Sequence, residues 1–201
     1  MKKREKIERD FQNLLEIIEN QRPGYIAAMD EGVSDEIIRD CIKIHPIPEG
    51  LMAIYSCVKG LSVSKLIEKF DYPTNFIPGC NLINIYEIDK IINLLKAVHR
   101  NPEPWAWQPD MIPFLVYCDV DYYCVRTLPS DQSVVFCSKE NQWITICQNI
   151  EDFILIITEC YKQNAYFLDD VYLEKNYDLE EKFILKFNPN YYSQNDLQPE
   201  V

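Results

Sequence analysis

The spacing of apolar residues changes along the chain, and this change limits the fold class. Before residue 100, apolar residues recur every three or four positions, which indicates amphipathic helices. After residue 110 they form short continuous or alternating runs rich in Val, Ile, Tyr and Phe, which indicates strands. Helical spacing returns after residue 149. Helices and strands are therefore segregated, and this predicts an α+β fold in a single domain.

Four helices are expected in the first half. The first covers 2–20 and ends near Arg22-Pro23-Gly24. Ser34 is a suitable N-cap for the second, since its hydroxyl can accept from a free backbone N–H. The third begins at Pro48 and would be capped by Gly60, and the fourth covers 88–98. The predicted inward stripe of the second helix consists of Ile37, Ile38, Cys41 and Ile42.

Strands are expected at 83–86, 112–118, 121–127, 133–137 and 143–147. Asn149 would cap a further helix, and an apolar element at 183–187 follows. The loop at 101–109 is rich in Pro and Trp and cannot form a regular helix. We divide the chain into an N-terminal helix at 1–22, a core domain at 23–170, and a C-terminal extension at 171–201 with a loose polar end.

The negative charge of the chain is concentrated in one region. The net charge is −12, but residues 1–101 carry 14 Lys and Arg against 15 Asp and Glu. Residues 102–181 carry 4 against 15. Such a region repels nucleic acid and anionic lipid and attracts a basic partner. A solvated face that keeps the protein soluble is the alternative interpretation.

The cysteines and the N-terminus indicate a cytoplasmic protein. The charged N-terminal segment has no apolar signal region, so reduced thiols are expected at Cys41, Cys57, Cys80, Cys118, Cys124, Cys137, Cys147 and Cys160. With no CxxC motif and with only His45 and His99 to assist, neither a zinc site nor a Cys–His hydrolase is favoured. We therefore expect no metal, no cofactor and no enzymatic activity.

A set of aromatic and acidic residues in 102–181 forms the candidate partner-binding site. Trp105 and Trp107 lie in a proline-stiffened loop and could contact a partner, although either could instead fill the edge of the core. Asp119 and Asp121 would lie on one side if both were extended, although such a pair is more often a polar turn. The full set is Trp105, Trp107, Asp119, Asp121, Tyr122, Asp131, Asp169 and Asp170.

Short sequence islands across 30–170 occur in an order that resembles the SUKH superfamily. They are 47–51 (IPEGL) with Tyr55 and Gly60, 107–114 (WQPDMIPF), Asp119 with 121–125 (DYYCV), 134–136 (VVF), and 150–153 (IEDF) with Tyr161. Lys59 stands where that family has Asn, which leaves the backbone contact of that Asn in doubt.

The resemblance implies a mixed or mostly antiparallel sheet flanked by helices, and no enzymatic activity. Proteins of this superfamily include bacterial immunity proteins that neutralise toxins, often nucleases, and regulators of yeast cell-wall synthesis. Because nucleases carry basic surfaces, an acidic inhibitor is physically consistent with the charge pattern. We expect an immunity-type protein that binds a basic toxin, with a regulatory or scaffold module as the alternative.

Overall fold

An antiparallel sheet of five strands, in the order β3-β4-β5-β6-β7, forms the centre of the fold. The computed structural model describes residues 3–44, 46–61, 75–98, 108–138, 143–170 and 172–191. Each strand pairs antiparallel with its neighbour, and this confirms the α+β fold. The strands are β3 (Cys80–Leu82), β4 (Met111–Tyr117), β5 (Asp121–Arg126), β6 (Val134–Cys137) and β7 (Trp143–Cys147).

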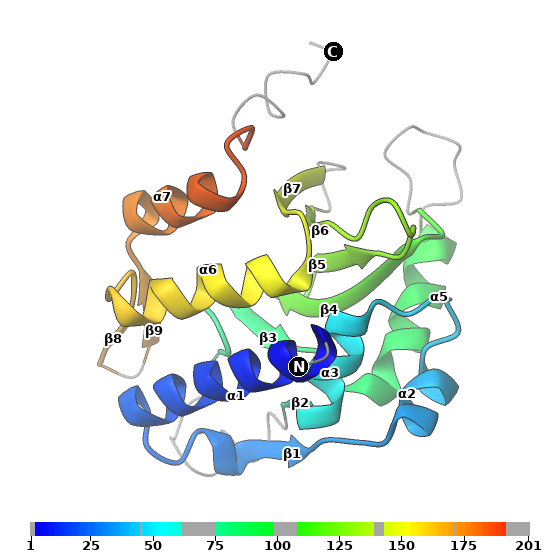
Figure 1. Cartoon of the computed structure of the whole chain (residues 1–201), viewed down its shortest axis with the longest axis horizontal. Helices are drawn as coiled ribbons and strands as arrows, with labels where there is room; N and C mark the ends of the chain where they lie inside the picture. Colours follow the sequence, from blue (N-terminus) through cyan, green and yellow to red (C-terminus); the bar gives the residue numbers. More distant parts are fainter. Residues whose placement is uncertain are drawn as a thin grey trace.

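Helices α1 (Lys3–Gln21) and α6 (Ile150–Lys162) run side by side across the sheet (Figure 1). Phe153 of α6 packs against Phe114 of β4, with their ring centroids 5.5 Å apart. The apolar stripe of α1 is buried as its spacing predicted, so this helix belongs to the same hydrophobic core. The other helices are α2 (Asp35–Cys41), α3 (Glu49–Cys57), α5 (Ile88–Val98) and α7 (Tyr177–Phe187).

Three helices begin at a side-chain cap. Ser34 accepts from the backbone N–H of Ile37 at the start of α2, and Asn149 accepts from that of Asp152 at the start of α6. Asn176 caps α7 in the same way. Each cap satisfies one backbone N–H that has no partner within its helix, and the two predicted caps are confirmed.

Strand β2 (Val58–Leu61) occupies the position where a helix cap was expected at Gly60. It pairs antiparallel with β1 (Met29–Glu31). Gly60 has a φ of +130°, and a Cβ at this position would lie 2.5 Å from Cα of Asn84. The glycine is therefore required by the close approach of two backbone segments, and the predicted helix cap is wrong.

Two further predictions are corrected by the structure. The expected strand at 83–86 is displaced, because β3 ends at Leu82 and 3-10 helix η2 (Ile85–Glu87) follows. Ile37 was expected on the buried stripe of α2, but its side chain is 36% exposed. With only seven residues in α2, Ile38 and Ile42 provide its fully buried contacts.

The first turns of α3 and α6 touch each other although about a hundred residues separate them. Gly50 lies against Ile150, and a Cβ added to Gly50 would stand only 2.7 Å from Cβ of Ile150. Nearby, the Tyr55 hydroxyl donates to the carbonyl oxygen of Ile83 over 3.0 Å. The islands at 47–51 and 150–153 are therefore joined through direct packing.

The chain continues past α6 into a hairpin of β8 (Tyr166–Asp169) and β9 (Tyr172–Lys175), followed by α7. The proposed domain boundary at 170 falls within this hairpin. Helix α7 packs against α6 and β7, and Asn188 at its end donates to the carbonyl oxygen of Thr145 over 2.7 Å. Within the described residues, the extension is thus packed onto the central domain.

Candidate partner-binding surface

The predicted acidic residues Asp119 and Asp121 lie at the turn between β4 and β5, but they differ in exposure. Asp119 is exposed and has a φ of +64°, next to Cys118 with a φ of +47°. Both therefore adopt the left-handed conformation of a tight hairpin turn, and Asp119 is not extended. Asp121 and Tyr122 are buried at the start of β5. Only Asp119 of these three presents its side chain fully to solvent.

Asp131 lies beyond the other end of β5, in the loop that leads to β6. Its carboxylate lies 3.3 Å from Nε of Arg126, and Asp110 contacts the same Nε at 2.9 Å. Because β5 has six residues, its two ends are about 20 Å apart. The structure therefore separates Asp131 from Asp119 and places it in an ion pair.

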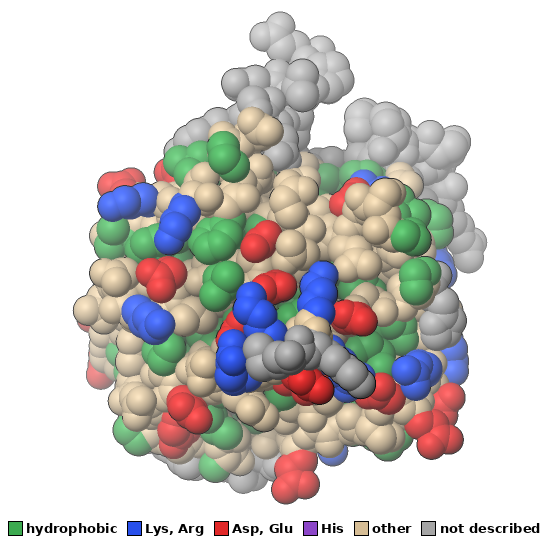
Figure 2. Space-filling view, in the orientation of Figure 1, with side chains coloured by type: hydrophobic (Ala, Val, Ile, Leu, Met, Phe, Trp, Pro, Cys, Tyr) green, Lys and Arg blue, Asp and Glu red, His purple; other side chains and the backbone are tan. Residues whose placement is uncertain are grey.

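Other acids of the 102–181 region also contact cations. Glu151 pairs with Lys6, and Glu180 pairs with Lys175. Figure 2 shows the face that carries the start of α1, where basic and acidic side chains lie interspersed. On this face the acids of α6 are balanced by the bases of α1, so the face does not form a uniform acidic patch.

Exposed acids gather instead on the C-terminal hairpin. Asp169, Asp170 and Glu174 are exposed there, and Asp178 is exposed in the first turn of α7. Between residues 163 and 181 the sequence has six Asp and Glu but a single basic residue, Lys175. We call the exposed residues of β8, β9 and the turn between them the hairpin surface; its described members are Phe167, Leu168, Asp169, Asp170, Tyr172 and Glu174.

A partly buried polar cluster holds this hairpin against α7. The carboxylate of Glu180 accepts from the Tyr166 hydroxyl at 2.6 Å and from Lys175 Nζ at 2.7 Å. Burial and the nearby carboxylate raise the pKa of Tyr166 well above its ordinary value. Burial alone would lower the pKa of Lys175, but attraction to Glu180 outweighs it and raises this pKa. The phenol and the ammonium therefore both keep their protons at neutral pH.

Sequence reasoning missed the aromatic part of the hairpin surface. Phe167 and Tyr172 are 40% and 60% exposed, and Tyr177 at the start of α7 is 70% exposed. The sequence at 172–175 (YLEK) does not alternate apolar with polar residues, and four residues are a short run, so it gives no clear signal for strand β9. Of the three aromatic residues that were predicted, Tyr122 is buried, and Trp105 and Trp107 lie outside the described residues.

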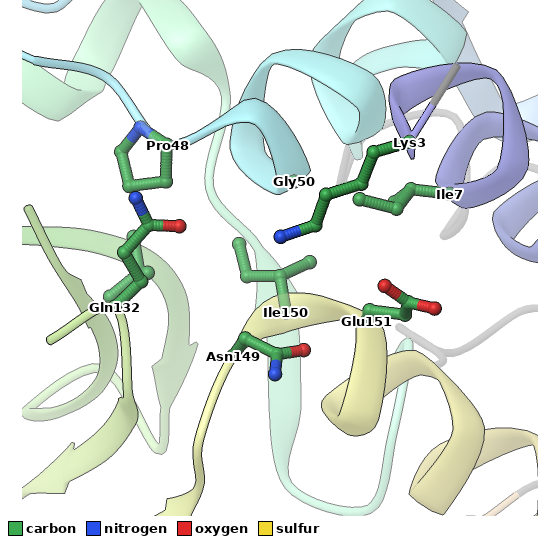
Figure 3. A pocket seen from close by; sticks show the side chains of 9 residues that line it. Lys3, Ile7, Pro48, Gly50, Gln132, Asn149, Ile150 and Glu151 are labelled. Carbon is green, nitrogen blue, oxygen red and sulfur yellow. The ribbon is translucent and has the colours of Figure 1, made fainter. Parts of the chain in front are cut away.

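The pockets among the described residues do not provide a stronger site. One lies where α1, α3 and α6 begin, lined by Lys3, Pro48 and Asn149 among others (Figure 3). Its volume of about 10 Å³ holds about one water molecule. A larger, open hollow of about 480 Å³ contains Arg4 and Arg39. Both arginines already contact Asp35, at 2.6 and 3.5 Å, which reduces their attraction for an anion.

Most of the thiols are unsuited to nucleophilic chemistry. Burial raises the pKa of six of them, to about 12 for Cys160, so these remain protonated at neutral pH. Five cysteines are buried, as expected, whereas Cys118 is exposed in the β4–β5 turn. All eight are free thiols.

The described ranges contain no group of three His, Cys, Asp or Glu residues placed to hold a metal ion. None of the described helices has the length and apolar character needed to cross a bilayer.

The model of the SMI1 / KNR4 family (SUKH-1) matches residues 32–156, which is more than half of the chain. The chain belongs to this family. The match begins just before α2 and ends within α6, so it includes the five-stranded sheet and the Gly50–Ile150 contact. A search of curated proteins finds no match. The C-terminal hairpin and α7 lie outside the matched SUKH-1 range.

Proposed function

We propose that this SUKH-1 protein is a non-enzymatic, immunity-type protein that binds and neutralises a basic toxin in the cytoplasm. The observation that carries the proposal is the set of exposed carboxylates on the hairpin surface, at Asp169, Asp170 and Glu174, within an acidic stretch of a SUKH-1 chain. A nuclease toxin has a basic surface where it holds nucleic acid. Exposed carboxylates attract such a surface and accelerate association at low salt.

The exposure of the predicted residues supports contact with the partner by some of them and not by others. Asp169, Asp170 and Asp119 are exposed, whereas Asp121 and Tyr122 are buried and Asp131 is paired with Arg126. The raised pKa values of six thiols support a binding role over thiolate catalysis. We therefore assign direct partner contact to the exposed acids and a structural role to the buried ones.

The test is a binding titration with any basic toxin-like protein that the neighbouring genes encode. Calorimetry at about 50 mM and about 500 mM salt should show a strong loss of affinity at high salt. The toxin's activity should fall in proportion to the complex formed. The double variant Asp169→Lys, Asp170→Asn should bind at least about tenfold more weakly at low salt. Asn is used at 170 because φ is +57° there, a conformation that Asn tolerates.

Asp131→Asn is the matched control, since this acid contacts Arg126 and lies in the β5–β6 loop rather than on the β8–β9 hairpin. It should leave toxin affinity unchanged. Tight binding that is indifferent to both salt and the hairpin variant would contradict an acidic interface. Binding without loss of toxin activity would instead support the regulatory alternative, and absence of binding would contradict the immunity role.

A further inference from the structure

The outward face of the β8–β9 hairpin combines two aromatic rings with two carboxylates. In the antiparallel register, Phe167 lies opposite Glu174 and Asp169 lies opposite Tyr172. Directly opposed residues, and residues two apart on one strand, point to the same side of a sheet. These four side chains therefore share one face, and all four are exposed.

The other face of the hairpin carries Tyr166 opposite Lys175 and Leu168 opposite Leu173. Its Tyr166 end is turned toward α7, whereas Leu168, nearer the turn, is 42% exposed. Tyr166 is 1% exposed, and its hydroxyl and the Lys175 ammonium both contact Glu180. The polar cluster with α7 thus fixes which face of the hairpin is turned toward solvent.

The two rings and the two carboxylates occupy opposite diagonals of the outward face. Diagonal neighbours on paired strands lie about 7–8 Å apart, which aromatic side chains span. A guanidinium or ammonium group placed on this face can therefore contact a ring and a carboxylate together. The chain already shows this chemistry nearby, since Nζ of Lys175 lies 4.8 Å from the ring centroid of Tyr177.

We infer that the outward face of the hairpin, made of Phe167, Asp169, Tyr172 and Glu174, binds arginine-bearing segments of a basic protein partner. The inference rests on the proposed function and names the place and chemistry of contact. Arginine fits best because its planar guanidinium stacks on rings and pairs with carboxylates at the same time. The excess of acids in 163–181 provides the longer-range attraction.

A capped hexa-arginine peptide is the probe, and its titration into isotope-labelled protein is followed by NMR at about 20 mM salt. Amide shifts should be largest within 166–175. A hexa-lysine peptide of equal charge should bind the same face more weakly. Shifts that spread over the molecule, or lie mainly on another element, would overturn the inference.

Two double variants measure separately how much the rings and the charges contribute to peptide binding. Phe167→Ser with Tyr172→Ser removes the rings and should weaken arginine binding about 4- to 25-fold, from about 2- to 5-fold per ring. It should also remove the preference for arginine over lysine. Asp169→Asn with Glu174→Gln should weaken both peptides and reduce the salt dependence. Tyr86→Ser is the matched control, because Tyr86 is 57% exposed on η2 and should leave both affinities unchanged.

The same variants distinguish failure of this inference from failure of the proposed function. If the toxin binds wild type and the ring variant equally well, the hairpin face is not the contact and the immunity role stands. If the hexa-arginine peptide binds the face as described but no neighbouring toxin binds, the immunity role fails while the chemistry of the face is upheld. Melting temperatures of the variants should match wild type, since all four side chains are exposed.

Discussion

Removing the Tyr166 hydroxyl should loosen the hairpin without unfolding the central domain. In Tyr166→Phe, the Glu180 carboxylate loses a 2.6 Å hydrogen bond but keeps the one from Lys175. Hydrogen bonds to charged groups contribute about 1.5–3 kcal/mol each to the free energy of unfolding. The Glu180 and Lys175 side chains are only 13% and 19% exposed, so water replaces the lost bond poorly. We therefore expect a loss in the upper half of that range.

Hydrogen exchange is the assay that places the loss, because local opening and global unfolding affect different amides. Amides of β8 and β9 should exchange about 40- to 150-fold faster in the variant, which corresponds to about 2.2–3 kcal/mol. Amides in α1 and in the five-stranded sheet should change little. Tyr177→Phe is the control, since it removes a hydroxyl from a residue that is 70% exposed. Equal exchange at β8–β9 in wild type and Tyr166→Phe would refute the role given to this polar cluster.

Three further perturbations probe other parts of the fold. Gly60→Ala should destabilise the protein by about 3 kcal/mol or more in urea unfolding, because its φ is +130° and its Cβ would collide with the Asn84 backbone. Asn149→Ala should cost about 1 kcal/mol through loss of the α6 cap, whereas Asn149→Gly should cost only a few tenths. Burial raises the pKa of eight phenols, and four of these side chains, those of Tyr25, Tyr55, Tyr161 and Tyr166, are at most 1% exposed. These four stay protonated in the folded state while those of the unfolded chain ionise. Stability should thus be complete below about pH 10 and fall above it by at least about 5 kcal/mol per pH unit, measured by urea unfolding at stepped pH.

The sequence predicted those helices and strands that are determined by residues close to one another in the chain. The stripe of α1, the caps at Ser34 and Asn149 and the long apolar run of β4 each depend on residues close in sequence. Strand β2 depends instead on β1, which lies far earlier in the chain, and its apolar residues directly continue those of α3. Some sequence patterns are equally compatible with the end of a helix and with a strand. Pairing with a distant strand then decides which of the two forms.

In the candidate site, too, the sequence predicted what depends on nearby residues and missed what depends on tertiary structure. The sequence identified the acidic half of the chain, but it could not show which carboxylates contact a cation. Arg126 pairs with both Asp110 and Asp131 only because the β5–β6 loop folds back toward the start of β4, where Asp110 lies. Asp119 and Asp131 are 12 positions apart in sequence, yet the hairpin register places them at opposite ends of one strand. Which of these acids are exposed therefore depends on the register of the paired strands and cannot be predicted from the composition.

The acids near the central sheet and those of the C-terminal extension have different roles. Asp110, Asp131 and Glu151 each contact a basic side chain of the domain, so their charge is largely used within the fold. In the extension, Glu180 pairs with Lys175, the one basic residue of 163–181, so that stretch has no second basic residue to pair with the acids of the outward hairpin face. That pairing also orients the hairpin, because Tyr166 and Lys175 project from its inner face. One partly buried carboxylate therefore both directs the rings and acids toward solvent and preserves their net negative charge. We expect a basic partner to be attracted to the hairpin, which lies outside the range matched by the SUKH-1 family.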